Sequence, residues 1–237
     1  MSFTLTLRRH LRQLQRSVVD RPRASAWLQQ NTSRTDWPEQ LHITQVVKPS
    51  SSTAAKLNNI ALAASHINDR EWVPGQSFVF WHLVGQPSQE KGFQAGRSLL
   101  GGELVSDMGG GLCQLAGGMY HLALQAGLGI EERHNHSVDL YTPATRYTPL
   151  GSDAAVAWAF KDLRLNNTLS QNIAWRISTR KDAVRFALHA EHPISECPIR
   201  FERLADRVEG RQVRTWRARG GVVEQINHST YKLPKQS

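Results

Sequence analysis

The sequence predicts an α+β protein, in which N-terminal helices lead through a glycine-rich loop into a central helix and then into an antiparallel sheet. In the first half of the chain, apolar residues recur at three- and four-residue steps, as in amphipathic helices. The second half contains short β-branched or alternating segments separated by Pro, Gly, Asn or Asp, as in strands joined by turns. Helices that are followed by a run of strands are typical of the α+β class.

Composition and length agree with a folded protein of one large or two small domains. The chain has 237 residues, of which 40% are hydrophobic and 21% are charged, and this excludes disordered and collagen-like classes. No apolar run approaches the ~20 residues of a membrane span, and the N-terminus lacks the apolar segment of a secretory signal. Two cysteines cannot form a disulfide framework. We therefore expect a cytoplasmic protein with free thiols.

The net charge of +9 is concentrated at the two ends of the chain. Residues 1–35 contain seven arginines and one acidic residue, and residues 198–237 contain nine basic and four acidic residues, whereas the centre is nearly neutral. A nucleic-acid partner is therefore disfavoured, while peripheral contact of the flanks with an anionic membrane stays open. The expected regions are a basic N-terminal helix and connector (1–52), a core domain (53–191) and a basic C-terminal extension with short strands (192–237).

The first predicted element is an amphipathic helix that ends before Pro22, because proline cannot continue a helix interior. Its apolar positions share one face: Leu7, Leu11, Leu14 and Val18. Its basic positions lie largely off that face: Arg8, Arg9, Arg12 and Arg16. Two interpretations stay open: a helix that faces a membrane or nucleic acid, or a helix docked on the core with a solvated basic face.

A connector with one strand at 41–47 follows, and then a second helix. Ser52 or Thr53 can cap this helix, and its apolar positions continue to Ile67. Residues 75–112 are rich in glycine and predict loops around a short strand at 78–81. Apolar residues return to helical spacing over 115–126, where we expect the central helix.

The remaining segments predict strands. In the core they are 137–141, 154–160, 163–165, 172–179 and 183–190. In the basic tail they are 208–216 and 221–226, with a turn at Gly220-Gly221.

The most informative string is Gly109-Gly110-Gly111-Leu112-Cys113-Gln114, which directly precedes the central helix. Three glycines leave open backbone, and a thiol at a helix start experiences the partial positive charge of unpaired N–H groups. That charge lowers the thiol pKa from its free value of about 8.5 and could stabilise an oxyanion. Cys113 therefore has the setting of a nucleophile.

A base and an orienting acid for this thiol follow downstream. On a strand, His134 and His136 would point to the same face, and Asp153 precedes the next strand and could orient an imidazole. A cysteine at a helix start followed by a histidine and an acid is also the linear order of papain-like enzymes, so a papain-like layout is expected.

Other roles for Cys113 stay open. A lone cysteine is commonly a small buried hydrophobe, and with two histidines it could bind Zn²⁺ instead. Cys197 lies beside Pro198 without catalytic context, and a Cys113–Cys197 disulfide is a further alternative. The prediction is no cofactor, with zinc as the alternative.

From about residue 57 to residue 191 the chain resembles the VanW family, named for an accessory protein of vancomycin-resistance gene clusters. The matching strings are Pro74 to Trp81 (family PGxxFSFW), Gly109 to Gln114 (GGGLCQ), Glu132-Arg133 with His136 (ER-x-x-H), Gly151 to Ala154 (G-x-D-A) and Asp162-Leu163 with Asn166-Asn167 (D-L…N). The resemblance implies a context of cell-envelope peptides and favours His136 over His134 as the partner of the thiol.

These observations lead to the hypothesis of a thiol-dependent acyl-transfer enzyme, an amidase, peptidase or transferase, acting on a small peptide or amide. Cys113 would be the nucleophile, His136 the general base and Asp153 the orienting acid, with Asp162 or Glu132 in reserve. The residues expected to contact the substrate or the oxyanion are Gly110, Gly111, Gln114, Trp81 and His134, and Phe78 and Phe80 would help to wall the groove. The alternative is a non-catalytic domain that binds a ligand or metal, and the oligomeric state stays open.

Overall fold

The computed structural model describes residues 3–29, 36–100, 103–139, 146–208 and 210–233. Its helices are α1 (Phe3–Asp20), η1 (Arg21–Ala26), α2 (Thr53–Ile67), α3 (Phe80–Val84), η2 (Gln89–Lys91) and α4 (Leu112–Gln125), where η marks a 3₁₀ turn. Its strands are β1 (Glu39–Val46), β2 (Ser77–Val79), β3 (Ala95–Leu100), β4 (Glu103–Met108), β5 (Gly129–Glu132), β6 (Arg164–Asn166), β7 (Ile173–Thr179), β8 (Ala183–Ala190), β9 (Ile199–Arg203), β10 (Arg211–Arg219) and β11 (Val222–Tyr231). The α+β class is confirmed.

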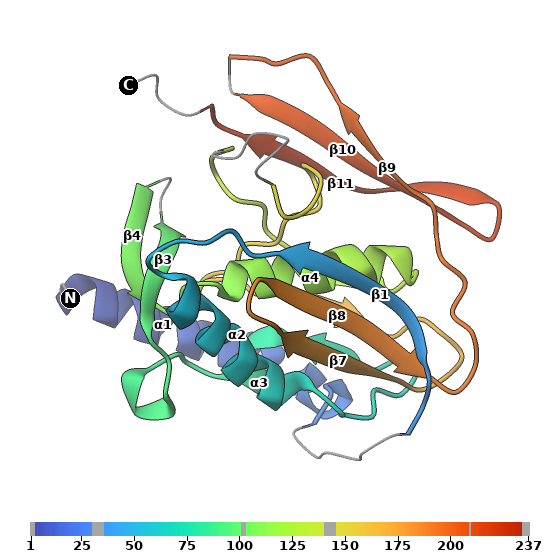
Figure 1. Ribbon diagram of the computed structural model, residues 1–237, viewed down its shortest axis with the longest axis horizontal. Helices are drawn as coiled ribbons and strands as arrows, with labels where there is room; N and C mark the ends of the chain where they lie inside the picture. The colour runs from blue at the N-terminus through green and yellow to red at the C-terminus, as the bar shows by residue number, and fades with distance from the viewer. Residues whose placement is uncertain (1–2, 30–35, 101–102, 140–145, 209, 234–237) are drawn as a thin grey trace.

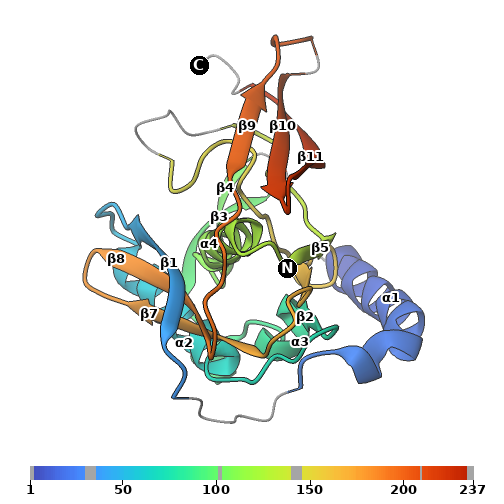
Figure 2. The same ribbon diagram turned by 90° about the vertical axis from the view of Figure 1, so that its right-hand side faces the viewer.

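Helix α4 lies at the centre of the molecule (Figure 1). Figure 2 looks nearly along it: the β1-β8-β7 sheet lies on one side, the β11-β10-β9 sheet lies above, and the β2-β6-β5 sheet lies on the other side with α1 beyond it. The β3-β4 hairpin is separate from these sheets. The residues on α4 can therefore be contacted from several parts of the chain.

The sequence of α4 explains why other elements can pack on several sides of this helix. Nearly all of its side chains are buried, as expected for a helix that is apolar around most of its circumference. Two adjacent glycines allow close approach from two directions. A Cβ at Gly118 would overlap the Phe186 ring of β8, whereas a Cβ at Gly117 would lie 3.5 Å from the Ala154 nitrogen, an ordinary contact.

This difference predicts opposite effects for two adjacent substitutions. Gly118→Ala should destabilise the protein by about 1–3 kcal/mol or more, because an added methyl group must displace a buried aromatic ring. Gly117→Ala should be neutral or stabilising by up to about 1 kcal/mol, because alanine restricts the unfolded chain and favours the helix. Denaturant unfolding of both variants measures the difference, and equal losses would contradict this packing.

The sheets join segments that are distant in the sequence. Strand β1 pairs antiparallel with β8, so that Ile43 faces Phe186, and β2 pairs with β6, so that Phe78 faces Leu165. The expectation of one antiparallel run after the helices is therefore incomplete. Two of the sheets pair a strand from the first half of the chain, β1 or β2, with later strands, and the β3-β4 sheet lies wholly in the first half.

In the core, the strand predicted at 154–160 is wrong, and the one predicted at 137–141 is not formed over the residues that the structure describes. Residues 154–160 form no strand: the Ala155 N–H bonds the His134 carbonyl at 2.7 Å, and residues 158–160 form a turn in which the Lys161 N–H bonds the Ala157 carbonyl at 2.9 Å. Residues 137–139 make only an isolated bridge, at Val138, and residues 140–141 of that predicted strand lie outside the described residues.

Several elements were not predicted. The glycine-rich region contains the β3-β4 hairpin, and the predicted 78–81 strand stops at Val79, where α3 begins. Strands β5 and β9 were also missed, because each has few residues and weak alternation.

Helix α1 ends at Asp20, as predicted from Pro22, but its orientation excludes one interpretation. Leu11 and Leu14 are well exposed, so the alternative in which the apolar stripe docks on the core is wrong. Within the described ranges, no helix combines the length and the apolarity needed to cross a bilayer. The three-region division, the papain-like layout and the cytoplasmic localisation stay predictions.

Candidate active site

The glycine loop between β4 and α4 is held in place by helix α2. Gly111 is the N-cap of α4 and has φ +103°, and a Cβ there would lie 2.6 Å from Lys56 Cγ. The buried Asn59 side chain donates to the Gly110 carbonyl at 3.0 Å and to the Gln94 carbonyl at 2.9 Å. Glycine is therefore required at Gly111 by both its backbone angle and its neighbour, and Asn59 fixes the path of the loop into the helix.

Cys113 is the second residue of α4 and is half-buried. Its neutral thiol donates to the Val156 carbonyl at 3.5 Å, and it borders the same cavity as His136. Burial raises the pKa of the Cys113 thiol, but the neighbouring His136 and the charge of Lys161 outweigh it, so the net pKa is lowered. Thiolate is thus favoured at this position.

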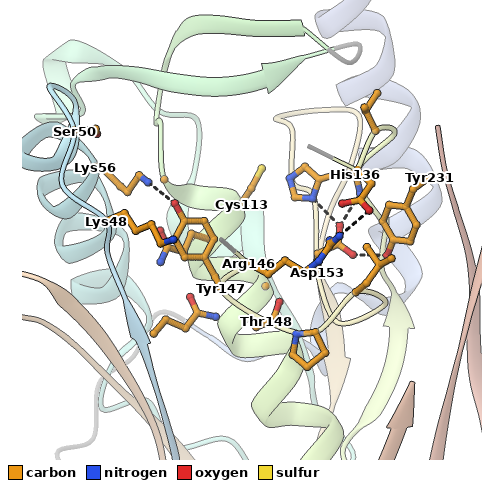
Figure 3. Close-up of a pocket in the computed structure, with 18 of the residues that line it drawn as sticks. Lys48, Ser50, Lys56, Cys113, His136, Arg146, Tyr147, Thr148, Asp153 and Tyr231 are labelled. Atoms are coloured by element: carbon orange, nitrogen blue, oxygen red, sulfur yellow. Dashed lines mark hydrogen bonds and ion pairs between the residues drawn. The ribbon is translucent and has the colours of Figure 1, made fainter. Parts of the chain in front are cut away.

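His136 is held by one carboxylate oxygen of Asp153. Asp153 Oδ2 accepts from His136 Nδ1 at 2.6 Å and from the His136 backbone N–H at 2.8 Å, which leaves Nε2 for the thiol (Figure 3). Burial lowers the pKa of His136, but its hydrogen bond to Asp153 and the neighbouring Cys113 raise it to about 10. The imidazole therefore favours its protonated form beside a thiolate.

The second oxygen of Asp153 is held by two groups from other elements. Asp153 Oδ1 accepts from Arg133 at 2.9 Å and from the Tyr231 hydroxyl at 2.5 Å. Burial raises the pKa of Asp153, but the His136 hydrogen bond and the Arg133 charge lower it well below its usual range. The carboxylate is thus fixed in its charged form, and it can orient the imidazole.

Tyr231 was missed by the sequence analysis. It ends β11, in the C-terminal extension, and is fully buried. Arg133 was quoted only as part of a motif, although its side chain also donates to the Asp153 carbonyl at 2.7 Å. No local pattern marks a tyrosine 78 residues away as a partner of Asp153.

His134 lies in a different cluster from Cys113. His134 Nε2 bonds Glu132 Oε1 at 2.8 Å, and Glu132 also forms an ion pair with Arg16 at 2.6 Å. Burial raises the pKa of Glu132, but the His134 and Arg16 contacts lower it to about 2. The two histidines therefore have separate partners. This differs from the prediction that they point to the same face of a strand.

Asp162 and the aromatic residues belong to the interior next to this cluster. Asp162 is buried, and burial together with the Glu132 charge raises its pKa to about 6 despite the opposing Arg164. Trp81 donates from its backbone to Asp162 Oδ1 at 3.2 Å and packs edge-on against Trp158. Phe78 and Phe80 are fully buried, so their predicted role in a groove wall is wrong, and the described cavity lining does not include Trp81.

The thiol, His136 and Asp153 border a cavity of about 420 Å³. Basic side chains contribute to its lining: Lys48, Lys56 and Arg146. Arg146 forms an ion pair with Asp139 at 2.7 Å, and Lys56 donates to the Tyr147 hydroxyl at 3.1 Å, as Figure 3 shows. Gly111 and Gln114 line this cavity as well, whereas Gly110 faces Asn59 and Gly96.

Metal binding and disulfide formation were the alternatives for Cys113. Among the described residues, no three His, Cys, Asp or Glu side chains are grouped so that they could hold a metal ion. Cys113 and Cys197 are both free thiols, so the alternative of a disulfide between them is wrong.

Comparison with known proteins gives consistent matches over the core of the chain. A family model described as VanW like protein matches residues 55–189. The uncharacterized protein YoaR of Bacillus subtilis (strain 168) is 30% identical over 145 residues, which cover 61% of this chain and 46% of that protein. The vancomycin B-type resistance protein VanW of Enterococcus faecalis (strain ATCC 700802 / V583) is 30% identical over 112 residues, which cover 47% of this chain and 41% of that protein.

The matched region spans less than half the length of either relative. No solved structure matches the chain. Because the family model covers more than half of the sequence, the chain belongs to the VanW family.

Proposed function

We propose that this protein is a thiol-dependent acyl-transfer enzyme, an amidase, peptidase or transferase, which acts on a peptide or amide of the cell-envelope type. The observation that carries the proposal is that Cys113 and the hydrogen-bonded pair His136–Asp153 lie at the edge of one cavity, with His136 lowering the pKa of the thiol. A nucleophile beside a base that is oriented by an acid has the elements of a cysteine-based acyl transfer.

The first chemical step follows from the protonation states that the site favours. The Cys113 thiolate attacks the carbonyl carbon of the substrate, a C–S bond forms, and the carbonyl π electrons move to oxygen. The first N–H groups of a helix have no acceptor within the helix, so the N–H groups of Cys113 and Gln114 can stabilise that oxyanion.

The proton on His136 then completes the step. The imidazolium donates its Nε2 proton to the leaving nitrogen as the C–N bond breaks, and a thioester on Cys113 remains. Water or an acceptor amine attacks the thioester with the neutral imidazole as base, which releases the acyl group and restores the ion pair. Water as the acceptor gives hydrolysis, and an amine gives transfer.

The substrate class rests on the cavity and on the relatives. The cavity is large enough for a small ligand. The enterococcal relative is named for vancomycin resistance, and this supports a cell-envelope substrate.

Acylation of the protein tests the proposal. An activated acyl ester should add one acyl group to Cys113, detected by mass spectrometry of the intact protein and of its peptides. Cys113→Ser should lose the adduct while remaining folded.

The matched control is Cys197→Ser, because Cys197 is buried and lies outside the candidate active-site cavity. This variant should acylate like the wild type. Equal acylation of folded wild-type and Cys113→Ser proteins would overturn the proposal, and stoichiometric zinc bound through Cys113 would replace it with a metal-binding function.

A further inference from the structure

We propose that Gln45 and Gln114 form a subsite that binds an amide group of the ligand beside the reacting carbonyl. The two side chains come from different elements, β1 and α4, and both line the cavity that contains Cys113. The identity of this ligand as a substrate rests on the proposed function, but its binding does not.

Among the described residues, both glutamine side chains are buried without hydrogen-bond partners. Gln45 is 3% exposed and Gln114 is 8% exposed. Within the described part of the chain, neither the Nε2 nor the Oε1 atom of either side chain has a partner. Buried polar groups are almost always hydrogen-bonded, because an unsatisfied group loses its hydration without replacement.

The position of Gln45 makes a purely structural role a poor explanation. Along this segment every second residue faces inward. Besides Gln45, the residues at these inward-facing positions are partly or fully buried and apolar: Leu41, Ile43 and Val47. An apolar residue at position 45 would continue this pattern and would leave no polar atom unsatisfied. The glutamine therefore costs stability in the free protein, and a bound ligand can supply the missing partners.

The chemistry of the two side chains identifies the ligand group. A carboxamide offers both N–H donors and a carbonyl acceptor and carries no charge. A peptide group offers the complementary N–H and carbonyl. Because the reacting carbonyl must also reach Cys113, the ligand would contain at least two amide groups, one at the thiol and one at the glutamines.

Binding can be measured without turnover in a Cys113→Ala background. The probes are blocked dipeptides and their N-methylated counterparts, observed by ligand-detected NMR. We expect the dipeptides to bind and N-methylation to weaken binding at least tenfold, because a methyl group removes the N–H donor. Gln45→Met and Gln114→Met should bind both probe series equally weakly.

Stability gives a second measurement that does not depend on a probe. Gln45→Met should raise the melting temperature of the free protein, because it removes an unsatisfied polar group. Thr44→Met, at the exposed neighbouring position of β1, is the matched control and should leave probe binding unchanged.

A lower melting temperature for Gln45→Met, equal binding of both probe series by the parent protein, or no binding would overturn the inference. Selective binding together with absent acylation of Cys113 would instead overturn only the proposed function.

A separate observation concerns the outer face of α1. Leu7, Leu11, Leu14 and Val18 form its apolar stripe and are between 52% and 73% exposed. The opposite face is ionic and contacts the body of the protein: Arg16 pairs with Glu132 at 2.6 Å, and Asp20 pairs with Arg164 at 2.7 Å. The helix is therefore anchored by charge, with its apolar side turned outward.

We further infer that this stripe binds the surface of an anionic lipid bilayer. Charge complementarity selects this occupant, because Arg8 and Arg12 are exposed on the same helix and residues 1–35 contain seven arginines and one acidic residue. An apolar stripe that enters the headgroup region with arginines beside it is the arrangement of interfacial helices.

Vesicle sedimentation tests this inference. The full chain should bind phosphatidylglycerol-containing vesicles more strongly than phosphatidylcholine vesicles, and the double variant Leu11→Glu/Leu14→Glu should lose binding at least tenfold. Val222→Glu/Val223→Glu is the matched control, since these valines have comparable exposure, 67% and 64%, at the start of β11.

Equal binding by the two double variants would overturn the assignment to α1. Equal binding to both vesicle types would overturn the anionic specificity. A dimer in sedimentation velocity that Leu11→Glu/Leu14→Glu dissociates would assign the stripe to a second copy of the chain instead.

Discussion

Alkylation of Cys113 by iodoacetamide should remain fast well below about pH 8.5, the pKa of an ordinary thiol. The reason is the lowered pKa of Cys113 beside a His136 whose pKa is raised to about 10. An ordinary thiol loses about tenfold in rate for each pH unit below its pKa, because only the thiolate reacts. Here the fall in rate should instead begin at a lower pH than it does for an ordinary thiol.

The rate that is retained at neutral pH should depend on the imidazole. In His136→Gln the thiol loses its charged partner while burial still raises its pKa, so the rate at neutral pH should fall by about tenfold or more. Cys197→Ser should keep the wild-type profile. A wild-type profile that follows the titration of a free thiol would show that the ion pair does not form.

Replacement of Asp153 by asparagine should cause the largest loss of stability, about 3–5 kcal/mol. Arg133 is buried, with its side chain 5% exposed, and its ion-pair partner is Asp153. The substitution leaves a buried guanidinium uncompensated and removes the negative charge beside His136. Denaturant unfolding at neutral pH measures the loss.

The contribution of Asp153 to the free energy of unfolding should depend on pH in one specific direction. The pKa of Asp153 is lower in the folded state than in the unfolded state, so its contribution is complete above the unfolded pKa of about 3.9. It disappears as the pH falls through the folded pKa, so acid should destabilise the wild type more than Asp153→Asn below about pH 4.

Asp206→Asn is the matched control, because Asp206 pairs with the exposed Arg203 at 2.9 Å. Exposed pairs contribute about 0–1 kcal/mol. Similar losses of stability for the two variants would mean that the buried charge of Arg133 does not need Asp153 to compensate it.

Local patterns in the sequence predicted the helices that carry the site. Thr53 to Ile67 and the helix after the three glycines were found from apolar spacing and capping residues, which act within a few residues. Cys113 was singled out for its place after the glycines, and the structure does place it in the first turn of α4.

The contacts that complete the site could not be predicted, because they join distant parts of the chain. Tyr231 reaches Asp153 only because β11 pairs with β10 above α4, and Gln45 borders the cavity only because β1 pairs with β8. Strand pairing depends on the packing of the whole core, so neither residue has a local signal. The wrong strand at 154–160 has a related cause, since its backbone bonds the histidine segment instead of a neighbouring strand.

The most direct test of the thiolate–imidazolium pair is the protonation state of His136. NMR of its ring nitrogens at neutral pH should show both protonated in the wild type, because Asp153 and the Cys113 thiolate stabilise the imidazolium. In Cys113→Ser the ring should lose much of that stabilisation and titrate at lower pH. A neutral ring in the wild type, unchanged by Cys113→Ser, would contradict a thiolate–imidazolium pair at the start of α4.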